Sequence, residues 1–301
     1  MDLQQAYYEQ KFEILFLKSK GNTFQELFEK LMGLAYKTDF MPCRPWGNRG
    51  DLKNDGFLKS EKKLFQVYAP NEMKEAKAIK KITNDFDGAK KYWKTHFIKW
   101  AFVHNADDGL PPHVIKVLLD FQKANRAISI ETWGLEKLRT VFRRIFLEDK
   151  QIWLGFAPTD ETKKKLGFGD LQPVLDHIKT RSVSVNLPIN DVPQGKIEAN
   201  ALSESVATLI KEGMSKADLV RQFFDKWHDP EWGEKIANSF REKYKCLREQ
   251  KCIPNEIFAE LQTWAGGEQR GTPEHELAVL TVLSYYFERC DIFEEPGREK
   301  R

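Results

Sequence analysis

The first part of the chain alternates between helical and strand spacing of its apolar residues. Residues 24–34 place apolar side chains three or four positions apart, which predicts an amphipathic helix. Thr23 and Glu26 have the spacing of a capping box, so we expect Thr23 to be the N-cap of this helix. The short apolar segments 55–59 and 64–68 are separated by a polar turn, and this arrangement predicts a β-hairpin.

Helical and strand patterns continue to alternate after the hairpin. The predicted helices cover 70–86, 111–123 and 135–146, and the predicted strands cover 100–103 and 127–130. The order helix, hairpin, helix, strand, helix, strand, helix predicts an α/β fold with a mixed sheet that helices cover on both faces. We therefore expect an α/β domain over residues 1–156.

The pattern changes after residue 156. Residues 157–200 are rich in Pro, Gly, Asp and Lys and show no sustained period, so they are interpreted as a linker with one short helix over 171–178. From residue 201 onward the apolar spacing is helical, and the predicted helices cover 201–212, 215–227, 230–250, 254–265 and 273–289. An all-α bundle over 201–301, serving assembly or dimerisation, is the expected second domain.

The composition excludes several classes of protein. With 41% hydrophobic and 31% charged residues, the chain is a globular protein and not a disordered one. No segment has the ~18 consecutive apolar residues of a membrane-spanning helix, and the N-terminus lacks the pattern of a secretory signal. The four cysteines form no CxxC pair. We therefore expect a cytoplasmic protein with reduced cysteines and no membrane partner.

The charge is distributed unevenly along the chain. Residues 1–150 hold 27 Lys and Arg against 20 Asp and Glu, whereas the remainder holds 21 against 25. A basic first half is typical of a protein that meets a polyanion such as nucleic acid. A solvated surface without any partner explains the same excess, so the charge leaves both interpretations open.

Candidate chemistry gathers around the predicted hairpin. Asp55 stands at the edge of its first strand, and Gln66 stands on the second strand. Hard cations such as Mg²⁺ bind a few oxygen ligands and share the phosphate of a substrate. Such an ion polarises a phosphodiester and lowers the pKa of an attacking water. Asp55 before a glycine is equally typical of an ordinary turn, and Gln66 can satisfy a buried backbone group instead.

The same segment resembles the PD-(D/E)xK restriction-endonuclease-like superfamily, and in particular its Mrr-like branch. The resemblance covers roughly residues 20–135 and rests on the Gly-rich run 47–56, which ends in Asp55-Gly56, followed by Gln66 on the next strand. It implies a metal-dependent nuclease in which Asp55 and Glu26 bind Mg²⁺ or Mn²⁺. It also implies that Gln66 orients the metal or the attacking water.

Tyr68 is the main departure from the superfamily pattern, because it stands where the motif has a lysine. A phenol is neutral at pH 7 and cannot supply a cation to the phosphate. The resemblance therefore implies a lysine from a neighbouring element. The candidates are Lys53, Lys77 and Lys81, and Lys81 is assigned the catalytic role. The candidate residues for binding the nucleic acid are Arg44, Arg49, Lys53 and Lys77.

Five segments together resemble the bacterial ABC-three-component family of predicted conflict or phage-defence proteins. They are residues 44–47, 53–56, 65–72, 102–105 and 286–294. In that family a nuclease-like module precedes a helical C-terminal module that mediates assembly. The resemblance implies a role in an anti-phage or conflict system and a separate ATPase as a possible partner.

Two hypotheses about function follow. In the first, the chain is a Mg²⁺-dependent DNA endonuclease, the effector of such a system, and its C-terminal helices form a homodimer that cuts both strands. In the second, the nuclease-like sheet has lost catalysis and binds nucleic acid or a partner protein as a sensor or adaptor. The sequence has no P-loop, no Rossmann fingerprint and no nucleophile elbow, which argues against NTPases, dehydrogenases and α/β-hydrolases.

Overall fold

The computed structural model describes residues 1–44, 52–179, 195–227, 229, 231–267, 271–289 and 292–294. The chain divides into two compact units. The first, which we call the sheet unit, is Leu15–Asp149, and the second, the helical unit, combines Met1–Ile14 with Lys150–Arg301. Each is described by itself below.

The sheet unit contains five strands and the helices that cover them. Its helices are α2 (Gly21–Tyr36), η1 (Lys37–Asp39), α3 (Glu75–Trp93), α4 (Pro112–Ala124) and α5 (Leu135–Arg143). Its strands are β1 (Phe40–Pro42), β2 (Gly56–Leu58), β3 (Lys63–Tyr68), β4 (Lys99–His104) and β5 (Ser129–Trp133). This mixed α/β architecture confirms the predicted fold class and the predicted hairpin, which is β2 and β3.

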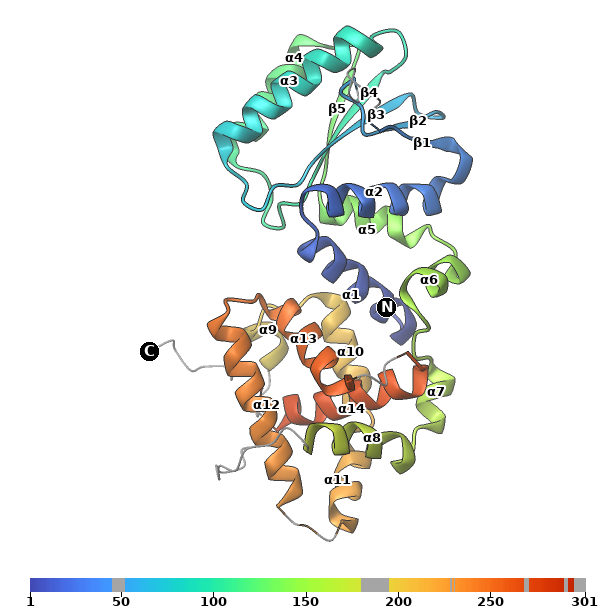
Figure 1. The fold of residues 1–301 in the computed structure, drawn as a ribbon, viewed down its shortest axis with the longest axis vertical. Helices are drawn as coiled ribbons and strands as arrows, with labels where there is room; N and C mark the ends of the chain where they lie inside the picture. Colours follow the sequence, from blue (N-terminus) through green and yellow to red (C-terminus); the bar gives the residue numbers. More distant parts are fainter. Residues whose placement is uncertain are drawn as a thin grey trace. The chain divides into compact units, whose positions relative to one another are not determined.

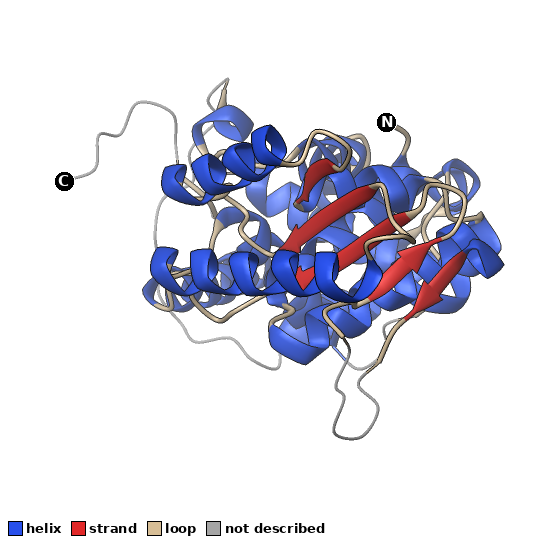
Figure 2. Ribbon diagram, turned by 90° about the horizontal axis from the view of Figure 1, so that it is seen from above, coloured by secondary structure: helices blue, strands red, loops and turns tan. Residues whose placement is uncertain are grey.

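The strands lie in the order β1-β2-β3-β4-β5. The pairs β1–β2 and β2–β3 are antiparallel, whereas β3–β4 and β4–β5 are parallel. Helix α3 makes the crossover from β3 to β4, and α4 makes the crossover from β4 to β5. Figure 1 shows α3 and α4 on one face of the sheet and α2 and α5 on the other. Figure 2, with the strands in red, shows the twist of the sheet.

The two faces of the sheet have separate apolar layers, because neighbouring strand residues point to opposite sides. On the α3–α4 face, Leu64 of β3 packs with Trp100 and Phe102 of β4. On the α2–α5 face, the ring of Phe65 lies 5.3 Å from that of Phe28 on α2 and 4.9 Å from that of Trp133 on β5. The alternation of β3 therefore assigns its even-numbered residues to one layer and its odd-numbered residues to the other.

The helical unit is built around one central helix. Its elements are α1 (Leu3–Lys18, which continues into the sheet unit), α6 (Leu147–Leu154, which begins there), α7 (Asp160–Lys165), α8 (Phe168–Lys179), α9 (Lys196–Ala199), α10 (Glu204–Met214), α11 (Ala217–Lys226), α12 (Trp232–Glu249), α13 (Pro254–Gly266) and α14 (Pro273–Glu288). Every residue of α14 from His275 to Phe287 is buried, as is typical of the centre of a bundle. A side chain at Gly213 of α10 would put a Cβ 2.7 Å from the carbonyl oxygen of Leu280, so the close approach of α10 to α14 requires glycine there.

Among the described residues, no helix combines the length and apolarity needed to cross a lipid bilayer. This holds also for α14, whose buried face includes Thr281 and Ser284.

Several boundaries differ from the sequence-based expectations. Helices α7 and α8 fall in the predicted linker 157–200, yet they belong to the helical unit, because α8 buries Leu171, Val174, Leu175 and Ile178. The domain boundary therefore lies near residue 150 and not at residue 156. The helical spacing of these four residues matches the short helix predicted over 171–178, and α8 extends it to Phe168–Lys179.

The start of α2 also differs from the prediction. The helix begins at Gly21, and Thr23 is its third residue and not its N-cap. The Thr23 hydroxyl accepts a hydrogen bond from the Lys20 backbone N–H at 3.0 Å and donates to the Lys20 carbonyl at 2.7 Å. Helix α2 thus begins earlier than predicted. Helix α3, in contrast, begins later, at Glu75 instead of residue 70.

Candidate functional site

The antiparallel pairing of β2 and β3 positions Asp55. Its backbone N–H donates to the carbonyl of Phe65 at 2.9 Å, so the ladder extends one residue before β2. The next residue must be small, because a Cβ on Gly56 would lie 2.6 Å from the ring of Phe40. Asp55 is 5% exposed and Gln66 is 1% exposed. The hairpin therefore holds both side chains inside the protein.

Among the described residues, three N–H groups donate to the carboxylate of Asp55. Its Oδ2 accepts hydrogen bonds from Gln66 Nε2 at 2.5 Å and from the backbone N–H of Val67 at 2.7 Å. Its Oδ1 accepts from Gln25 Nε2 on α2 at 3.3 Å. Charge-assisted hydrogen bonds of this kind stabilise a buried carboxylate. The structure therefore brings Asp55 and Gln66 into direct contact, with N–H donors around the carboxylate.

Glu26 does not reach this cluster. It is exposed on α2, and its neighbour Gln25 is the residue that contacts Asp55. Adjacent residues on an α-helix point about 100° apart, so only one of the two can face the hairpin. Gln25 was missed by sequence reasoning because a neutral amide gives no signal of its own beside an acidic neighbour.

Of the two predicted phosphate-binding arginines, the structure describes Arg44. The exposed side chain of Arg44 pairs with Glu29 of α2, with 2.6 Å between Nη2 and Oε2. Arg49 lies outside the described residues. Arg44 therefore already has an acidic partner on α2.

Lys53 and Lys81 pair with an aspartate that the sequence reasoning missed. Asp85 of α3 is completely buried; its Oδ1 lies 3.2 Å from Lys53 Nζ, and its Oδ2 pairs with Lys81. Neither contact has the alignment of a hydrogen bond, so both are electrostatic. The signal was available in the sequence, because Asp85 follows Lys81 by four residues and shares the apolar face of α3 with Ile82.

Tyr68, which the resemblance sets in place of a lysine, is the last residue of β3, two residues after Gln66. It pairs with His104 across the parallel strands, and its ring centroid lies 6.2 Å from that of Phe102. Its side chain packs against the apolar layer under α3. The phenol therefore contributes to the core of this face.

The described groups that hydrogen-bond to Asp55 do not supply oxygen ligands for a divalent cation. Mg²⁺ and Mn²⁺ bind oxygen atoms, whereas the groups that meet the Asp55 carboxylate are N–H donors. In the part of the chain that the structure describes, no group of three His, Cys, Asp or Glu side chains could hold a metal ion. One buried oxygen, Gln66 Oε1, has no hydrogen-bond partner among these residues.

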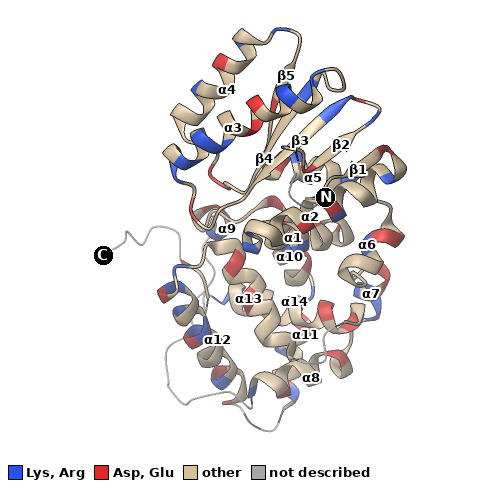
Figure 3. Ribbon diagram, turned by 45° about the horizontal axis from the view of Figure 1, so that its top comes forward, with Lys and Arg blue, Asp and Glu red and all other residues tan. Residues whose placement is uncertain are grey.

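A stripe of lysines follows the exposed face of α3. Lys77, Lys80, Lys91 and Lys94 all point into solvent, and the last of them is the C-cap residue of the helix. At 100° per residue the four side chains fall within a sector about 100° wide. None of them has an ion-pair partner within the described residues. The basic residues along α3 are blue in Figure 3.

The comparison with protein families gives one match, to the C-terminal part of the chain. Residues 169–294 match the model described as C-terminal domain 10 of the ABC-three component (ABC-3C) systems. This match supports the ABC-3C family. No curated protein and no solved structure matches the chain.

The ABC-3C match falls within the helical unit and begins with α8. It covers less than half of the chain and leaves the sheet unit unassigned. ABC-3C components work in multi-protein systems, and membership suggests a role in conflict or defence.

Proposed function

We propose that the chain is a component of an ABC-3C conflict system whose sheet unit binds nucleic acid without cutting it. The lysine stripe of α3 carries this proposal. From Lys77 to Lys94 the stripe runs about 25 Å along the helix, at ~1.5 Å per residue. A nucleic acid backbone presents phosphate groups all along a stretch of this length. Mobile lysines neutralise these phosphates and release their counterions.

The state of the nuclease-like residues supports binding without cleavage. The carboxylate of Asp55 accepts hydrogen bonds from three N–H groups, and Tyr68 packs in an apolar layer. The resemblance has a lysine where this chain has Tyr68, and Lys53 and Lys81 are two candidates to replace it. Both of them pair with Asp85. Catalysis of phosphodiester cleavage needs a cation at the developing phosphate charge, and these residues are engaged elsewhere.

Charge reversal on α3 tests the binding. The double variant Lys77→Glu/Lys91→Glu should lower the affinity for a 20-base-pair duplex by at least about tenfold at 100 mM salt, because two attractions become repulsions. Fluorescence anisotropy measures the affinity. The control is Lys116→Glu/Lys123→Glu, which places the same charge change on exposed residues of α4. Equal affinity losses in the two variants would contradict a site on α3.

A metal-dependent nuclease is the second candidate, and the buried Gln66 Oε1, an oxygen without a hydrogen-bond partner among the described residues and on a side chain that contacts Asp55, favours it. Incubation of plasmid DNA with Mg²⁺ and either the natural chain or Asp55→Ala separates the two functions. Intact plasmid in both reactions, with duplex binding retained, supports the proposal. Cutting by the natural chain that disappears in Asp55→Ala contradicts it and establishes the nuclease.

A further inference from the structure

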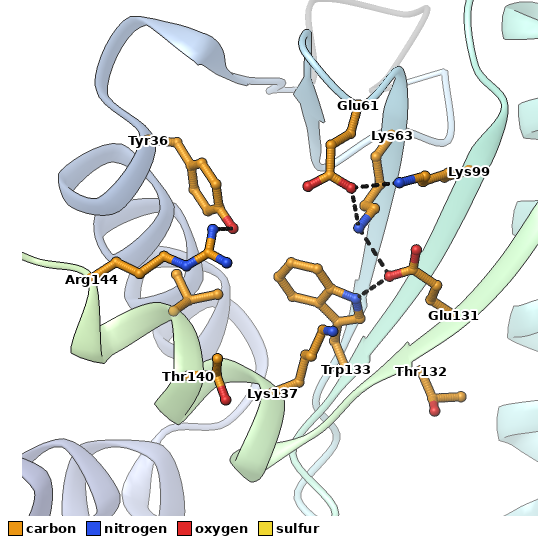
Figure 4. A pocket seen from close by; sticks show the side chains of 11 residues that line it. Tyr36, Glu61, Lys63, Lys99, Glu131, Thr132, Trp133, Lys137, Thr140 and Arg144 are labelled. Atoms are coloured by element: carbon orange, nitrogen blue, oxygen red, sulfur yellow. Dashed lines mark hydrogen bonds and ion pairs between the residues drawn. The ribbon is translucent and has the colours of Figure 1, made fainter.

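A cavity of about 440 Å³ opens on the α2–α5 face of the sheet unit. It lies on the opposite face of the sheet from the α3 lysines, since it is lined by Lys63, which shares its side of β3 with Phe65. Figure 4 shows its charged and aromatic side chains converging from α2, the hairpin, β4, β5 and α5. Ligand-binding cavities typically have volumes of ~300–1,000 Å³, so the space suits a small molecule.

One wall of the cavity is a chain of compensated charges. Glu61 accepts from Lys99 at 2.8 Å and lies 2.9 Å from Lys63. Lys63 in turn donates to Glu131 at 2.9 Å, and Glu131 also accepts from the indole N–H of Trp133 at 2.8 Å. The two lysines lower the pKa of Glu61 to about 2, so this carboxyl stays ionised at neutral pH. Two positive and two negative charges balance on this wall.

The opposite wall carries two positive charges without acidic partners. Lys137 and Arg144 lie seven residues apart at α5, two helical turns, and therefore on the same side. Lys137 Nζ lies 5.7 Å from the ring centroid of Trp133, and Arg144 donates to the Tyr36 hydroxyl at 3.0 Å. Neither has an ion pair within the residues that the structure describes. Since the first wall is neutral, the cavity has a net charge of +2.

The distribution of these groups selects a class of ligand. A phosphate monoester carries about −1.5 to −2 charges at pH 7, which matches the excess of the α5 wall. The cavity volume of about 440 Å³ is many times the ~30 Å³ of liquid volume that one water molecule occupies. An anion with further groups attached therefore fits this space. The carboxylates of Glu61 and Glu131 are 34% and 24% exposed and can accept hydrogen bonds from hydroxyl groups. An anion with attached hydroxyls satisfies both walls.

We propose that this cavity binds a small hydroxylated phosphate ester, with the phosphate at Lys137 and Arg144 and the hydroxyls at Glu61 and Glu131. Both sugar phosphates and nucleotides have this chemistry. The site is independent of the α3 lysines, so binding here adds a small-molecule input to a nucleic-acid-binding unit. A ligand that engages α5 and the hairpin together also links two elements that are far apart in sequence.

Calorimetric titration tests the site with ribose 5-phosphate and adenosine 5′-monophosphate as probes, beside ribose and inorganic phosphate. At least one of the two esters should bind, and at least about tenfold more tightly than either ribose or inorganic phosphate, because each of these lacks one half of the recognised chemistry. The two esters differ only in the base, so their affinities distinguish a sugar phosphate from a nucleotide. Failure of both esters to bind, or equal binding of inorganic phosphate, overturns the proposal.

Variants locate the binding. Lys137→Ala and Arg144→Ala should each weaken the binding ester by about tenfold or more, since each removes a charged donor from a solvent-accessible wall. Lys116→Ala, an exposed lysine of α4, is the control and should bind as the natural chain does. Unchanged affinity in both α5 variants overturns the assignment. Duplex affinity should not change in the α5 variants, so this result stays distinguishable from a failure of the α3 site.

Discussion

Asp55 illustrates how a single buried carboxylate can join separate elements. Its two oxygens accept hydrogen bonds from β3, through Gln66 and Val67, and from α2, through Gln25. All three donors are N–H groups, so they prefer an ionised acceptor. This residue therefore helps to fix α2 against the hairpin, whatever further role it has.

Asp55→Asn should destabilise the protein by about 1–3 kcal/mol. The amide is nearly the same size as the carboxylate, but its NH₂ group would face N–H donors, and at least one buried donor would lose its acceptor. Urea unfolding measures the change in the free energy of unfolding. Asp120→Asn on the exposed side of α4 is the control and should change it by less than about 0.5 kcal/mol. A loss no larger than in that control would show that the three hydrogen bonds do not stabilise the fold.

His104 gives a prediction about pH. Burial lowers the pKa of this histidine to about 4, below its ordinary value near 6.5. The unfolded chain therefore binds the proton more readily, and the free energy of unfolding should fall by about 2–3 kcal/mol as the pH drops from 6.5 to 4. The contribution is fully present above pH 6.5. Urea unfolding across this range should show a smaller fall in His104→Gln.

The matched control for the pH series is His96→Gln, because His96 is exposed. It should keep the pH dependence of the natural chain. An identical fall in His104→Gln and His96→Gln would assign the acid sensitivity to other groups.

Not every member of the Asp55 cluster could be predicted from sequence. The hairpin pattern sets Asp55 and Gln66 on paired strands, so their proximity follows from two apolar segments and a turn. The contribution of Gln25 depends on the rotation of α2, and the sequence placed the N-cap of that helix three residues too late, at Thr23 instead of Lys20. Asp85 could be recognised by its spacing of four residues from Lys81, but a charged residue within an apolar stripe does not by itself predict burial.

At the scale of elements, helix α14 and the segment after it depend on a buried lysine. Lys196 is 3% exposed, and its Nζ donates to the carbonyls of Phe287 at 2.8 Å and Ile292 at 2.6 Å. The last carbonyls of a helix have no partner within the helix, and a cation there also opposes the negative end of the dipole. Asn200 adds a hydrogen bond to the Glu294 carbonyl at 2.8 Å.

Lys196→Met should therefore lower the free energy of unfolding by about 2–4 kcal/mol. Methionine fills a similar volume, but it removes a charged hydrogen-bond donor from two buried carbonyls. Chemical denaturation measures the loss, and Lys211→Met, at an exposed position of α10, is the control. Equal stability of the two variants would mean that solvent replaces the lysine at these carbonyls.

The elements differ in how well the sequence predicts them. Helix α13 was expected over 254–265 and spans Pro254–Gly266, because its apolar period is regular and a proline marks its start. Helix α1 was not predicted, because polar side chains share its buried face. Gln10 donates to Gln262 at 2.9 Å, and Glu13 accepts from Asn255 at 2.6 Å. A pattern based on hydrophobicity cannot recognise polar residues that are buried in pairs.

At the scale of the whole molecule, the charge and the family match fall on different parts of the chain. Residues 1–150 hold 27 basic and 20 acidic residues, whereas the ABC-3C match covers residues 169–294. The family match therefore leaves the basic part of the chain unassigned. The sequence predicted the division from composition and period, whereas the position of its boundary required the packing of α7 and α8.

The salt dependence of duplex binding measures the number of phosphate contacts. Four lysines on α3 predict that the logarithm of the binding constant falls with the logarithm of the salt concentration with a slope of about −3 to −4. Each substitution of Lys77, Lys80, Lys91 or Lys94 by alanine should reduce the slope by about 1. Anisotropy titrations from 50 to about 300 mM salt give this slope. A slope that none of the four substitutions changes would place the phosphate contacts elsewhere.

Strand β3 contributes to both candidate sites. Gln66, on one face of the sheet, contacts Asp55, and Lys63, on the other face, lines the charged cavity. Insertion or deletion of a single residue in β3 would turn every following side chain to the opposite face. A change in strand length would therefore damage both sites together. Length variation among natural relatives should therefore concentrate outside Lys63–Tyr68.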